Sequence, residues 1–339
     1  MKILILQLKR IGDLILTTPV FPLLRERFPN AQLTLATMET CRGLLPALPD
    51  LHHAIVIRRK GSNMGTWARL VVSSYDLCLD FTGNDRSALL TLLSKAPRRL
   101  TWQGVRKNPI RPLVYTEFVN ASVRENHTVD LHLALLRPLG IPPPATPESI
   151  PFGLKLPLPA HEEASRLLTN AGISGPYVVV HPGTARPEKY WLPERWAAVI
   201  DHCQRELGLP CVVTGSPDPL EKEHIQAIRA RLRTPLRDFS GKMELLTLGA
   251  LIERAHLLIS MDSAPVHFGA AFRTRQISLF GQTNPYHWHP RHPNSIVLMA
   301  GHEGPVTEFS THFSRRPLSD LSTETVINAI GSVLKANVR

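Results

Sequence analysis

The chain has 339 residues, of which 43% are hydrophobic and 20% charged. This composition excludes a disordered protein, and the length predicts two domains at about 150 residues per domain. No apolar run approaches the roughly 18–20 residues of a membrane span, and the four cysteines form no CxxC pair, so we expect a cytoplasmic protein with reduced thiols. Residues 1–155 carry 20 basic against 11 acidic side chains and residues 156–339 carry 19 against 17, so the first half predicts an anionic partner: a nucleic acid, an acidic membrane face or a phosphorylated substrate.

The first half of the chain alternates short apolar segments with amphipathic ones. Ile3–Leu8 is a near-continuous apolar run, as expected for a parallel strand covered on both faces. A helix is predicted after it, with Thr18 at the N-cap and Pro19 at the first helical position. Further strands are predicted at Gln32–Ala36, Ala54–Ile57 and Asp76–Phe81. This alternation of strand and helix predicts a parallel α/β sheet.

A proline-rich segment separates the two halves. Gly140–Pro159 holds seven prolines in twenty residues and predicts a stiff linker. We therefore expect a first domain at residues 1–150, a second at 151–320 and a C-terminal helix within 321–339. The second half repeats the alternation, with helices predicted at His161–Ala171, Pro193–Leu207, Leu220–Arg231, Pro265–Phe272 and Thr323–Ala336, and strands at Tyr177–Val180, Cys211–Thr214, Leu257–Ser260 and Gln276–Phe280. The two halves predict two Rossmann-like domains that face a cleft, where open α/β sheets bind ligands.

The first candidate site is the loop after the opening strand, Lys9-Arg10-Ile11-Gly12-Asp13. Gly12 permits a tight turn, which would project Asp13 from the carboxyl end of the strand. A carboxylate at this place is able to remove a proton from a substrate hydroxyl. The alternative is that Asp13 caps the following helix, a common role for aspartate. The loop contains no GxGxxG fingerprint of dinucleotide-binding proteins.

Two further loops have the chemistry of an anion site. His181-Pro182-Gly183-Thr184 follows a predicted strand, and Lys189 lies five residues after Thr184. Free backbone N–H groups, a hydroxyl and a mobile cation suit a phosphate or diphosphate, although an ordinary polar loop is the alternative. Asp262 and Ser263 precede Pro265 at a predicted helix start, which either binds an anion or is simply capped by these side chains.

The fourth segment, Phe280–Pro290, again follows a predicted strand and contains part of a histidine cluster. His287, His289 and His292 lie close together in the sequence, which is compatible with a zinc site. No cysteine lies near them, and the chain contains 15 histidines, so a chance cluster is the preferred interpretation and no metal is predicted.

These four segments, in this order, resemble glycosyltransferase family 9, the heptosyltransferases of the lipopolysaccharide inner core. The resemblance spans nearly the whole chain and rests on Ile-Gly-Asp with Leu-Thr-Thr-Pro-Val, His-Pro-Gly-Thr with Lys-x-Trp, Asp-Ser-x-Pro-x-His, and Phe-Gly-x-Thr-x-Pro-x-x-Trp. Within the family, the third-heptose enzymes are the most similar branch. The resemblance implies a two-domain glycosyltransferase B fold, with the acceptor in the first domain and the nucleotide sugar in the second. It also implies that the C-terminal helix crosses back to the first domain and that no metal or other cofactor is required.

Residue roles follow from the same resemblance. Asp13 resembles the general base, and Lys189 resembles the cation beside the donor diphosphate. The other residues expected to bind the donor are Thr184, Glu221, Asp262, Ser263, Ala264 and His267. The resemblance thus implies an inverting, metal-independent transfer of heptose from ADP-heptose to an anionic lipopolysaccharide core, with domain closure over both substrates.

The basic first half is interpreted as the acceptor side of this reaction. The residues expected to hold the anionic acceptor are Lys9, Arg10, Arg98, Arg99 and Arg106. Peripheral contact with the inner-membrane surface is expected, and nucleic acid is not. Two alternatives remain at this point: a nucleotide-sugar epimerase on the same architecture, and a basic nucleic-acid-binding protein. The second is disfavoured because aromatic residues make up only 6% of the chain.

Overall fold

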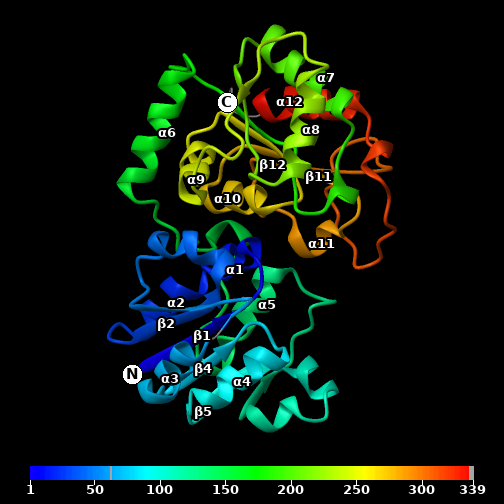
Figure 1. Ribbon diagram of the computed structural model, residues 1–339. Helices are drawn as coiled ribbons and strands as arrows, with labels where there is room; N and C mark the ends of the chain where they lie inside the picture. Colours follow the sequence, from blue (N-terminus) through cyan, green and yellow to red (C-terminus); the bar gives the residue numbers. More distant parts are fainter. Residues whose placement is uncertain (62, 336–339) are drawn as a thin grey trace. The chain divides into compact units, whose positions relative to one another are not determined.

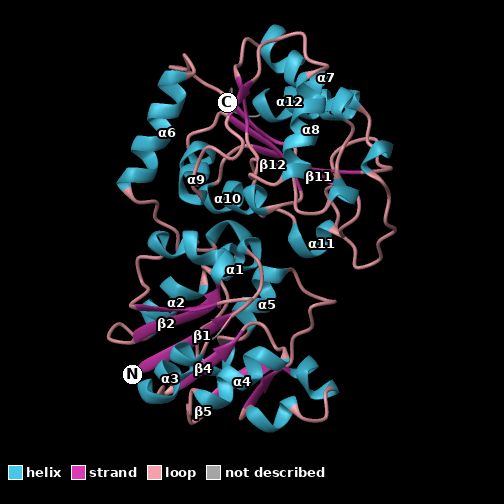
Figure 2. Cartoon of the chain, in the orientation of Figure 1, coloured by secondary structure: helices cyan, strands magenta, loops and turns pink. Residues whose placement is uncertain are grey.

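The protein folds into two compact units, Met1–Lys155 and Leu156–Arg339. The computed structural model describes residues 1–61 and 63–335 (Figure 1). The boundary falls inside the proline-rich segment, and each unit contains one six-stranded sheet flanked by helices (Figure 2). Among the described residues, no helix is long and apolar enough to cross a membrane.

The first unit is built on a parallel sheet with strand order β3-β2-β1-β4-β5-β6. Its strands are β1 (Lys2–Gln7), β2 (Gln32–Met38), β3 (His53–Ile57), β4 (Leu77–Asp80), β5 (Arg98–Trp102) and β6 (Glu117–Val119). Its helices are α1 (Ile11–Thr17), α2 (Val20–Arg27), α3 (Met64–Ser73), α4 (Asp85–Leu93) and α5 (Thr128–Ala134), with short 3-10 helices η1 (Glu39–Ala47), η2 (Gln103–Lys107), η3 (Arg111–Val114), η4 (Arg137–Leu139) and η5 (Pro147–Ser149).

The second unit repeats this plan with strand order β12-β11-β10-β7-β8-β9. Its strands are β7 (Val178–His181), β8 (Cys211–Val213), β9 (Arg237–Asp238), β10 (Leu257–Met261), β11 (Gln276–Phe280) and β12 (Ser295–Met299). Its helices are α6 (Leu158–Asn170), α7 (Pro193–Arg205), α8 (Pro219–Arg229), α9 (Leu245–Glu253), α10 (Ala264–Phe272), α11 (Pro285–Trp288) and α12 (Thr323–Lys335), with 3-10 helices η6 (Pro187–Lys189) and η7 (Leu318–Asp320).

Both sheets have the doubly wound order, in which strands are added first on one side of the first strand and then on its other side. The central strands are apolar on both faces because helices cover both sides of each sheet. Ile3–Leu6 of β1 and Val178–Val180 of β7 are fully buried. The predicted fold class, two Rossmann-like α/β sheets, is therefore confirmed.

Two helix predictions require correction. The first helix of the chain, α1, already begins at Ile11, so Asp13 lies in its first turn. Thr18 does not cap the next helix: its hydroxyl donates to the carbonyl of Ile15 at 2.8 Å, and Pro19 is the N-cap of α2. The segment between the strand and the proline holds the seven residues of α1, about two helical turns, which the proline signal concealed.

The C-terminal helix packs within the second unit. Val326, Ala329, Ile330 and Val333 of α12 belong to the hydrophobic core of that unit. These buried residues recur at the helical spacing and form one face of α12. The helix packs against α7, β11 and β12. The last predicted helical residue, Ala336, and the end of the predicted segment 321–339 lie outside the described residues.

Candidate functional site

Each sheet has one switch point, and the predicted site residues follow the strands that form it. In the first unit the switch lies between β1 and β4, and in the second unit between β7 and β10. Open α/β sheets bind ligands at the carboxyl ends of such strands. Asp13 follows β1, Lys189 follows β7 and Asp262 follows β10, so each unit brings its candidate residues to the expected edge of its own sheet.

Asp13 is held in the first turn of α1 by the loop that precedes it. Its Oδ2 accepts a hydrogen bond from the backbone N–H of Arg10 at 3.3 Å, and its Oδ1 lies 3.9 Å from the Nζ of Lys9. The carboxylate side chain is only 12% exposed. Through Oδ2, Asp13 thus makes a hydrogen bond at the start of α1, which is the helix-capping role named above as the alternative. Its Oδ1 makes only the long ion pair with Lys9. A carboxylate in this state can still accept a proton.

A buried polar cluster supports the turn that carries Asp13. The hydroxyl of Thr17 donates to the carbonyl of Asp13 at 2.7 Å and accepts from the amide of Gln7 at 2.8 Å. Nδ1 of His132 lies 3.1 Å from the same hydroxyl and 3.2 Å from the carbonyl of Leu16. Since both of these neighbours act as acceptors, the Nδ1 position carries the proton. Burial lowers the pKa of His132 to about 3, so the ring is neutral.

Asp80, which is not among the predicted site residues, organises the neighbouring loop. Its Oδ1 accepts the backbone N–H groups of Thr82 and Gly83 at 2.7 and 3.0 Å, and its Oδ2 accepts the hydroxyl of Tyr115 at 2.6 Å. Thr82 in turn accepts the backbone N–H of Leu8 at 2.8 Å. Burial raises the pKa of Asp80 above its ordinary value. The signal was an aspartate at the end of an apolar strand, followed by Phe-Thr-Gly.

The predicted acceptor-binding arginines do not all lie near Asp13. Arg98 and Arg99 begin β5 and are paired in register with Leu77 and Cys78. They therefore lie at the amino edge of a parallel sheet, opposite the carboxyl edge at which Asp13 lies. Arg98 forms a two-bond ion pair with Glu117, and Arg99 donates to the backbone carbonyls of residues 96 and 114. Their position corrects the prediction, and both guanidinium groups have structural partners.

Arg106 lies at the other end of β5, in the 3-10 helix η2 that follows it. Its guanidinium lies over the ring of Phe118, 4.2 Å from the ring centroid. Arg106, Lys9 and Arg10 therefore remain at the carboxyl edge of the first sheet, where a ligand of Asp13 would be bound.

In the second unit, the structure brings Lys189 and Asp262 into direct contact. The Nζ of Lys189 donates to Oδ2 of Asp262 at 2.6 Å, and the two side chains are only 11% and 10% exposed. Lys189 ends the 3-10 helix η6 after β7, and Asp262 directly follows β10. Pairing of β7 with β10, in which Ser260 lies opposite His181, is what makes this contact possible across 73 residues of sequence.

The helix start after Asp262 is not capped by its own side chain. Ser263 is the N-cap residue of α10, but its hydroxyl donates to the carbonyl of Met261 at 3.2 Å and makes no capping hydrogen bond. Ala264 and Pro265 begin the helix. His267, one turn along, is buried, and its ring lies 6.5 Å from that of Trp288. The positive end of a nine-residue helix therefore lies beside the Lys189–Asp262 pair.

Glu221 lies between two glycine turns that follow neighbouring strands. It belongs to α8, is 5% exposed, and accepts the backbone N–H of Ser216 at 2.8 Å through Oε2. A Cβ atom added at Gly183 would collide with this carboxylate, and one added at Gly215 would lie 3.3 Å from it. Gly183 is thus required by the close approach of Glu221, whereas at Gly215 the nearest obstacle to a Cβ atom is the side chain of Ile225 at 2.8 Å.

Aromatic and hydroxyl groups complete this part of the second unit. Thr184, in the loop after β7, is 9% exposed, and Nδ1 of His181 lies 2.9 Å from the hydroxyl of Thr214. The ring of Tyr190 stacks on His224 with centroids 4.4 Å apart. Burial lowers the pKa values of His181 and His224 to about 4, so both rings are neutral. Sequence reasoning missed the Tyr190–His224 stack, because Tyr190 lies beside the predicted Lys189 whereas His224 lies in α8, outside every motif.

The histidine cluster of the fourth segment is dispersed by the fold. His289 stacks on Phe309 at 3.8 Å, whereas His292 is buried with its Nε2 2.9 Å from the amide nitrogen of Gln276. Over residues 1–61 and 63–335, no group of three or more histidine, cysteine, aspartate or glutamate side chains is arranged to hold a metal ion. These histidines therefore have separate structural environments.

Comparison with known proteins identifies the family. The profile of "Glycosyltransferase family 9 (heptosyltransferase)" matches residues 65–317. The chain is 29% identical over 334 residues to lipopolysaccharide heptosyltransferase 3 of Escherichia coli K12, covering 95% of each protein. It is 25% identical over 318 residues to the lipopolysaccharide core heptosyltransferase OpsX of Haemophilus influenzae, covering 92% of this chain and 88% of that protein.

Solved structures share the fold over the full length. The glycosyltransferase family 9 protein of Veillonella parvula superposes with a TM-score of 0.83 at 24% identity, covering 99% of this chain and 97% of that one. The E. coli heptosyltransferase WaaC with ADP-2-deoxy-2-fluoro heptose superposes with a TM-score of 0.73 at 21% identity, covering 98% and 99%. At these identities, the likeness establishes the fold.

Proposed function

Because the chain belongs to glycosyltransferase family 9, we propose that it is a heptosyltransferase that transfers heptose from ADP-heptose to the lipopolysaccharide inner core with inversion at the anomeric carbon. The observation that carries this proposal is the Lys189–Asp262 contact beside the uncapped start of α10. Cation, carboxylate and helix dipole together match a sugar diphosphate, which has both charge and hydroxyl groups. The relatives named for lipopolysaccharide heptosyltransfer support the choice of acceptor.

The donor is assigned to the second unit. The diphosphate binds Lys189, the hydroxyl of Thr184 and the backbone at Ser263–Ala264, with His267 beside it. Glu221 accepts hydrogen bonds from the ribose of the adenosine, since its carboxylate is held between the glycine turns. A diphosphate that binds Lys189 competes with Asp262 for the ammonium group. The carboxylate of Asp262 is then left to accept hydrogen bonds from hydroxyl groups of the donor sugar.

The acceptor is assigned to the first unit. Asp13 removes the proton of the acceptor hydroxyl as its oxygen forms a bond to the anomeric carbon. The bond between that carbon and the diphosphate oxygen breaks, and ADP leaves with the electron pair. Lys189 stabilises the charge that develops on the leaving group, so the step is proposed to need no metal ion. Lys9, Arg10 and Arg106 are the basic groups left to hold the anionic acceptor at this edge.

The test is a transfer assay with ADP-heptose and a heptose-terminated lipopolysaccharide core. Lys189→Ala is expected to lower kcat by about 10²–10³, because it removes one preorganised charge from the leaving group. Asp13→Asn is expected to lower kcat by about 10²–10⁴ through loss of the base, with little change in the affinity for ADP. Mass spectrometry of the product and the anomeric configuration by NMR give the sugar and the stereochemistry.

Two variants of exposed residues serve as matched controls. Lys222→Ala removes an exposed ammonium group from the second unit, and Asp76→Asn removes an exposed carboxylate from the first. Both are expected to keep full turnover. Full turnover of well-folded Asp13→Asn would show that another group is the base. Conversion of ADP-heptose to an isomer without any acceptor would make the protein an epimerase.

A further inference from the structure

Helix α3 of the first unit is apolar and almost entirely on the surface. Of its ten residues, Met64–Ser73, only Leu70 is buried. Trp67 is 40% exposed and Val72 is 81% exposed. Met64, Ala68 and Val72 are spaced four residues apart and thus share one face. A surface helix of a globular protein normally turns its apolar stripe to the core, so the exposed stripe of α3 calls for a partner.

Two neighbouring elements extend this apolar surface. Helix α4 packs against α3 (Figure 1), and the 3-10 helix η3 packs against α4. Leu89 and Leu92, three residues apart on α4, are 43% and 55% exposed. Ile110, directly before η3, and Leu113 within it are 71% and 81% exposed. Exposed apolar residues therefore gather on three adjacent elements, which single scattered residues would not do.

The same segments carry an excess of basic residues. Residues 58–75 have four basic side chains and no acidic one, and residues 85–116 have seven basic side chains and one acidic one, Asp85, which pairs with Arg111 at 2.6 Å. Arg58, Arg59 and Lys60 directly precede α3. Positive charge beside exposed aliphatic and aromatic side chains is the composition of surfaces that lie in the headgroup region of anionic membranes.

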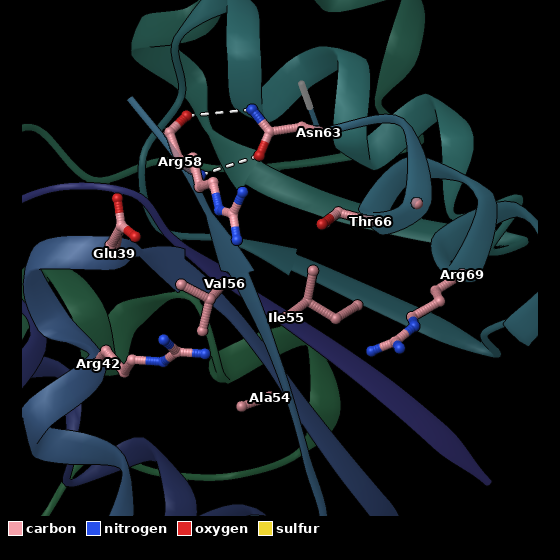
Figure 3. A pocket seen from close by; sticks show the side chains of 10 residues that line it. Glu39, Arg42, Ala54, Ile55, Val56, Arg58, Asn63, Thr66 and Arg69 are labelled. Carbon is pink, nitrogen blue, oxygen red and sulfur yellow. Dashed lines mark hydrogen bonds between the residues drawn. The ribbon is translucent and has the colours of Figure 1, made fainter. Parts of the chain in front are cut away.

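A pocket at the edge strand β3 adds a place for an anionic group. It has a volume of about 390 Å³ and lies between β3, η1 and α3 (Figure 3). Arg42, Arg58 and Arg69 line it, with Glu39 as the one carboxylate among its lining residues. In residues 1–61 and 63–335, no ion pair engages these three guanidinium groups. Three unpaired arginines around one hollow suit a phosphate group.

We propose that α3, the basic loop before it and the outer sides of α4 and η3 form a docking surface for an anionic phospholipid bilayer. The apolar side chains enter the headgroup boundary, and Arg42, Arg58 and Arg69 receive a lipid phosphate. This inference deepens the proposed function, on which it rests: an enzyme that extends a lipid-anchored core must work beside the membrane surface. A second copy of the chain is the less suitable occupant, since two surfaces of the same positive charge repel each other.

The test measures binding of the full chain to sedimented vesicles. Wild type is expected to bind vesicles of phosphatidylcholine with phosphatidylglycerol and to bind pure phosphatidylcholine vesicles much more weakly. Arg58→Glu/Arg69→Glu is expected to weaken binding by about fivefold or more for each charge removed. Val72→Ser/Leu113→Ser, at the two most exposed apolar positions of the surface, is expected to weaken it about tenfold.

The control is Leu158→Ser/Leu220→Ser, which changes exposed leucines of the second unit and is expected to bind like wild type. Val72→Ser/Leu113→Ser is also expected to keep wild-type melting temperature and wild-type transfer to a lipid-free acceptor. Equal binding of both vesicle types, or wild-type vesicle binding by both docking variants, would overturn the proposal. So would a wild-type dimer that Val72→Ser/Leu113→Ser converts to a monomer. Loss of catalysis with intact vesicle binding would instead contradict the proposed function alone.

Discussion

Glu221 is the residue whose surroundings are most tightly specified. Its carboxylate occupies the space where a side chain at Gly183 would be, and it lies 3.3 Å from the place of a Cβ atom at Gly215, where Ile225 is closer still. Glycine is therefore required at these positions by a close approach of another side chain, independently of any special backbone conformation. The loop that contains Gly183 can approach the carboxylate this closely only while its Cβ position is empty.

The first prediction concerns Gly183. Gly183→Ala is expected to push Glu221 out of its place, because the new methyl group would overlap the carboxylate. The affinity for ADP should fall at least tenfold, with a modest loss of thermal stability. Isothermal titration with ADP measures the first effect and thermal unfolding the second.

Gly175 offers a matched control in the same unit. A Cβ atom there meets nothing within 4 Å, so Gly175→Ala should leave ADP affinity unchanged. Wild-type affinity in Gly183→Ala would mean that Glu221 does not contribute to the nucleotide site.

At this scale the sequence predicted residue types better than their partners. Asp13, Lys189 and Asp262 could be singled out because each follows an apolar strand with a turn residue nearby. That Lys189 would pair with Asp262 could not be predicted, since it depends on β7 lying beside β10. The same limit explains Arg98 and Arg99: their charge was visible, but the direction of β5, which places them at the opposite edge, was not.

At the scale of single elements, the start of α10 differs from an ordinary capped helix. In α4, the side chain of Asn84 accepts the backbone N–H of Ser87 at 2.9 Å, which is a standard N-cap. In α10, the hydroxyl of Ser263 points to the carbonyl of Met261 instead. The two helices have nine residues each, so they form a matched pair for measuring what a cap contributes.

The second prediction compares these two caps. Asn84→Ala should lower the free energy of unfolding by about 1 kcal/mol, because it removes a capping hydrogen bond. Ser263→Ala should change it by less than about 0.5 kcal/mol, because no capping bond is present to lose. Urea unfolding of the two variants measures both. A larger loss for Ser263→Ala would show that its side chain does cap α10.

Element boundaries show where sequence reasoning reached its limit. The predicted strand Gln276–Phe280 agrees with β11 to the residue. Arg273 and Arg275 precede this apolar run and Gly281 follows it, so both of its ends are marked in the sequence. Helix α3 received no prediction, although its apolar residues Met64, Ala68 and Val72 recur at the helical spacing. The edge strands β6 and β9 are short and carry too few residues for a period to be read.

At the scale of the whole molecule, buried histidines couple stability to pH. Burial lowers the pKa of His132 to about 3 and those of His181 and His224 to about 4. The unfolded chain binds protons at these residues near pH 6.5, whereas the folded chain does not until about pH 4. The unfolded state therefore binds more protons in this window, and stability falls as the pH falls through it.

The third prediction follows from this sign. Between pH 6.5 and pH 4, each of these histidines should contribute a loss of up to about 1.4 kcal/mol per pH unit. His132→Asn keeps a nitrogen donor near Thr17 and removes one titrating group. It should therefore reduce the slope of the unfolding free energy against pH by up to about 1.4 kcal/mol per pH unit, the contribution of one proton. Urea unfolding at a series of pH values gives the slope. Leu131→Ala, a buried change without a titrating group, should lower stability at every pH and leave the slope unchanged.

All four cysteines, Cys41, Cys78, Cys203 and Cys211, are fully buried. Burial also raises the pKa of the Cys78 thiol to about 12, so its reactive thiolate is scarce at neutral pH. The native chain should therefore be inert to maleimide dyes. A pair of cysteines introduced at exposed positions, one in each unit, would carry the fluorophores alone, so that distances between the units can be followed during turnover with every natural thiol left in place.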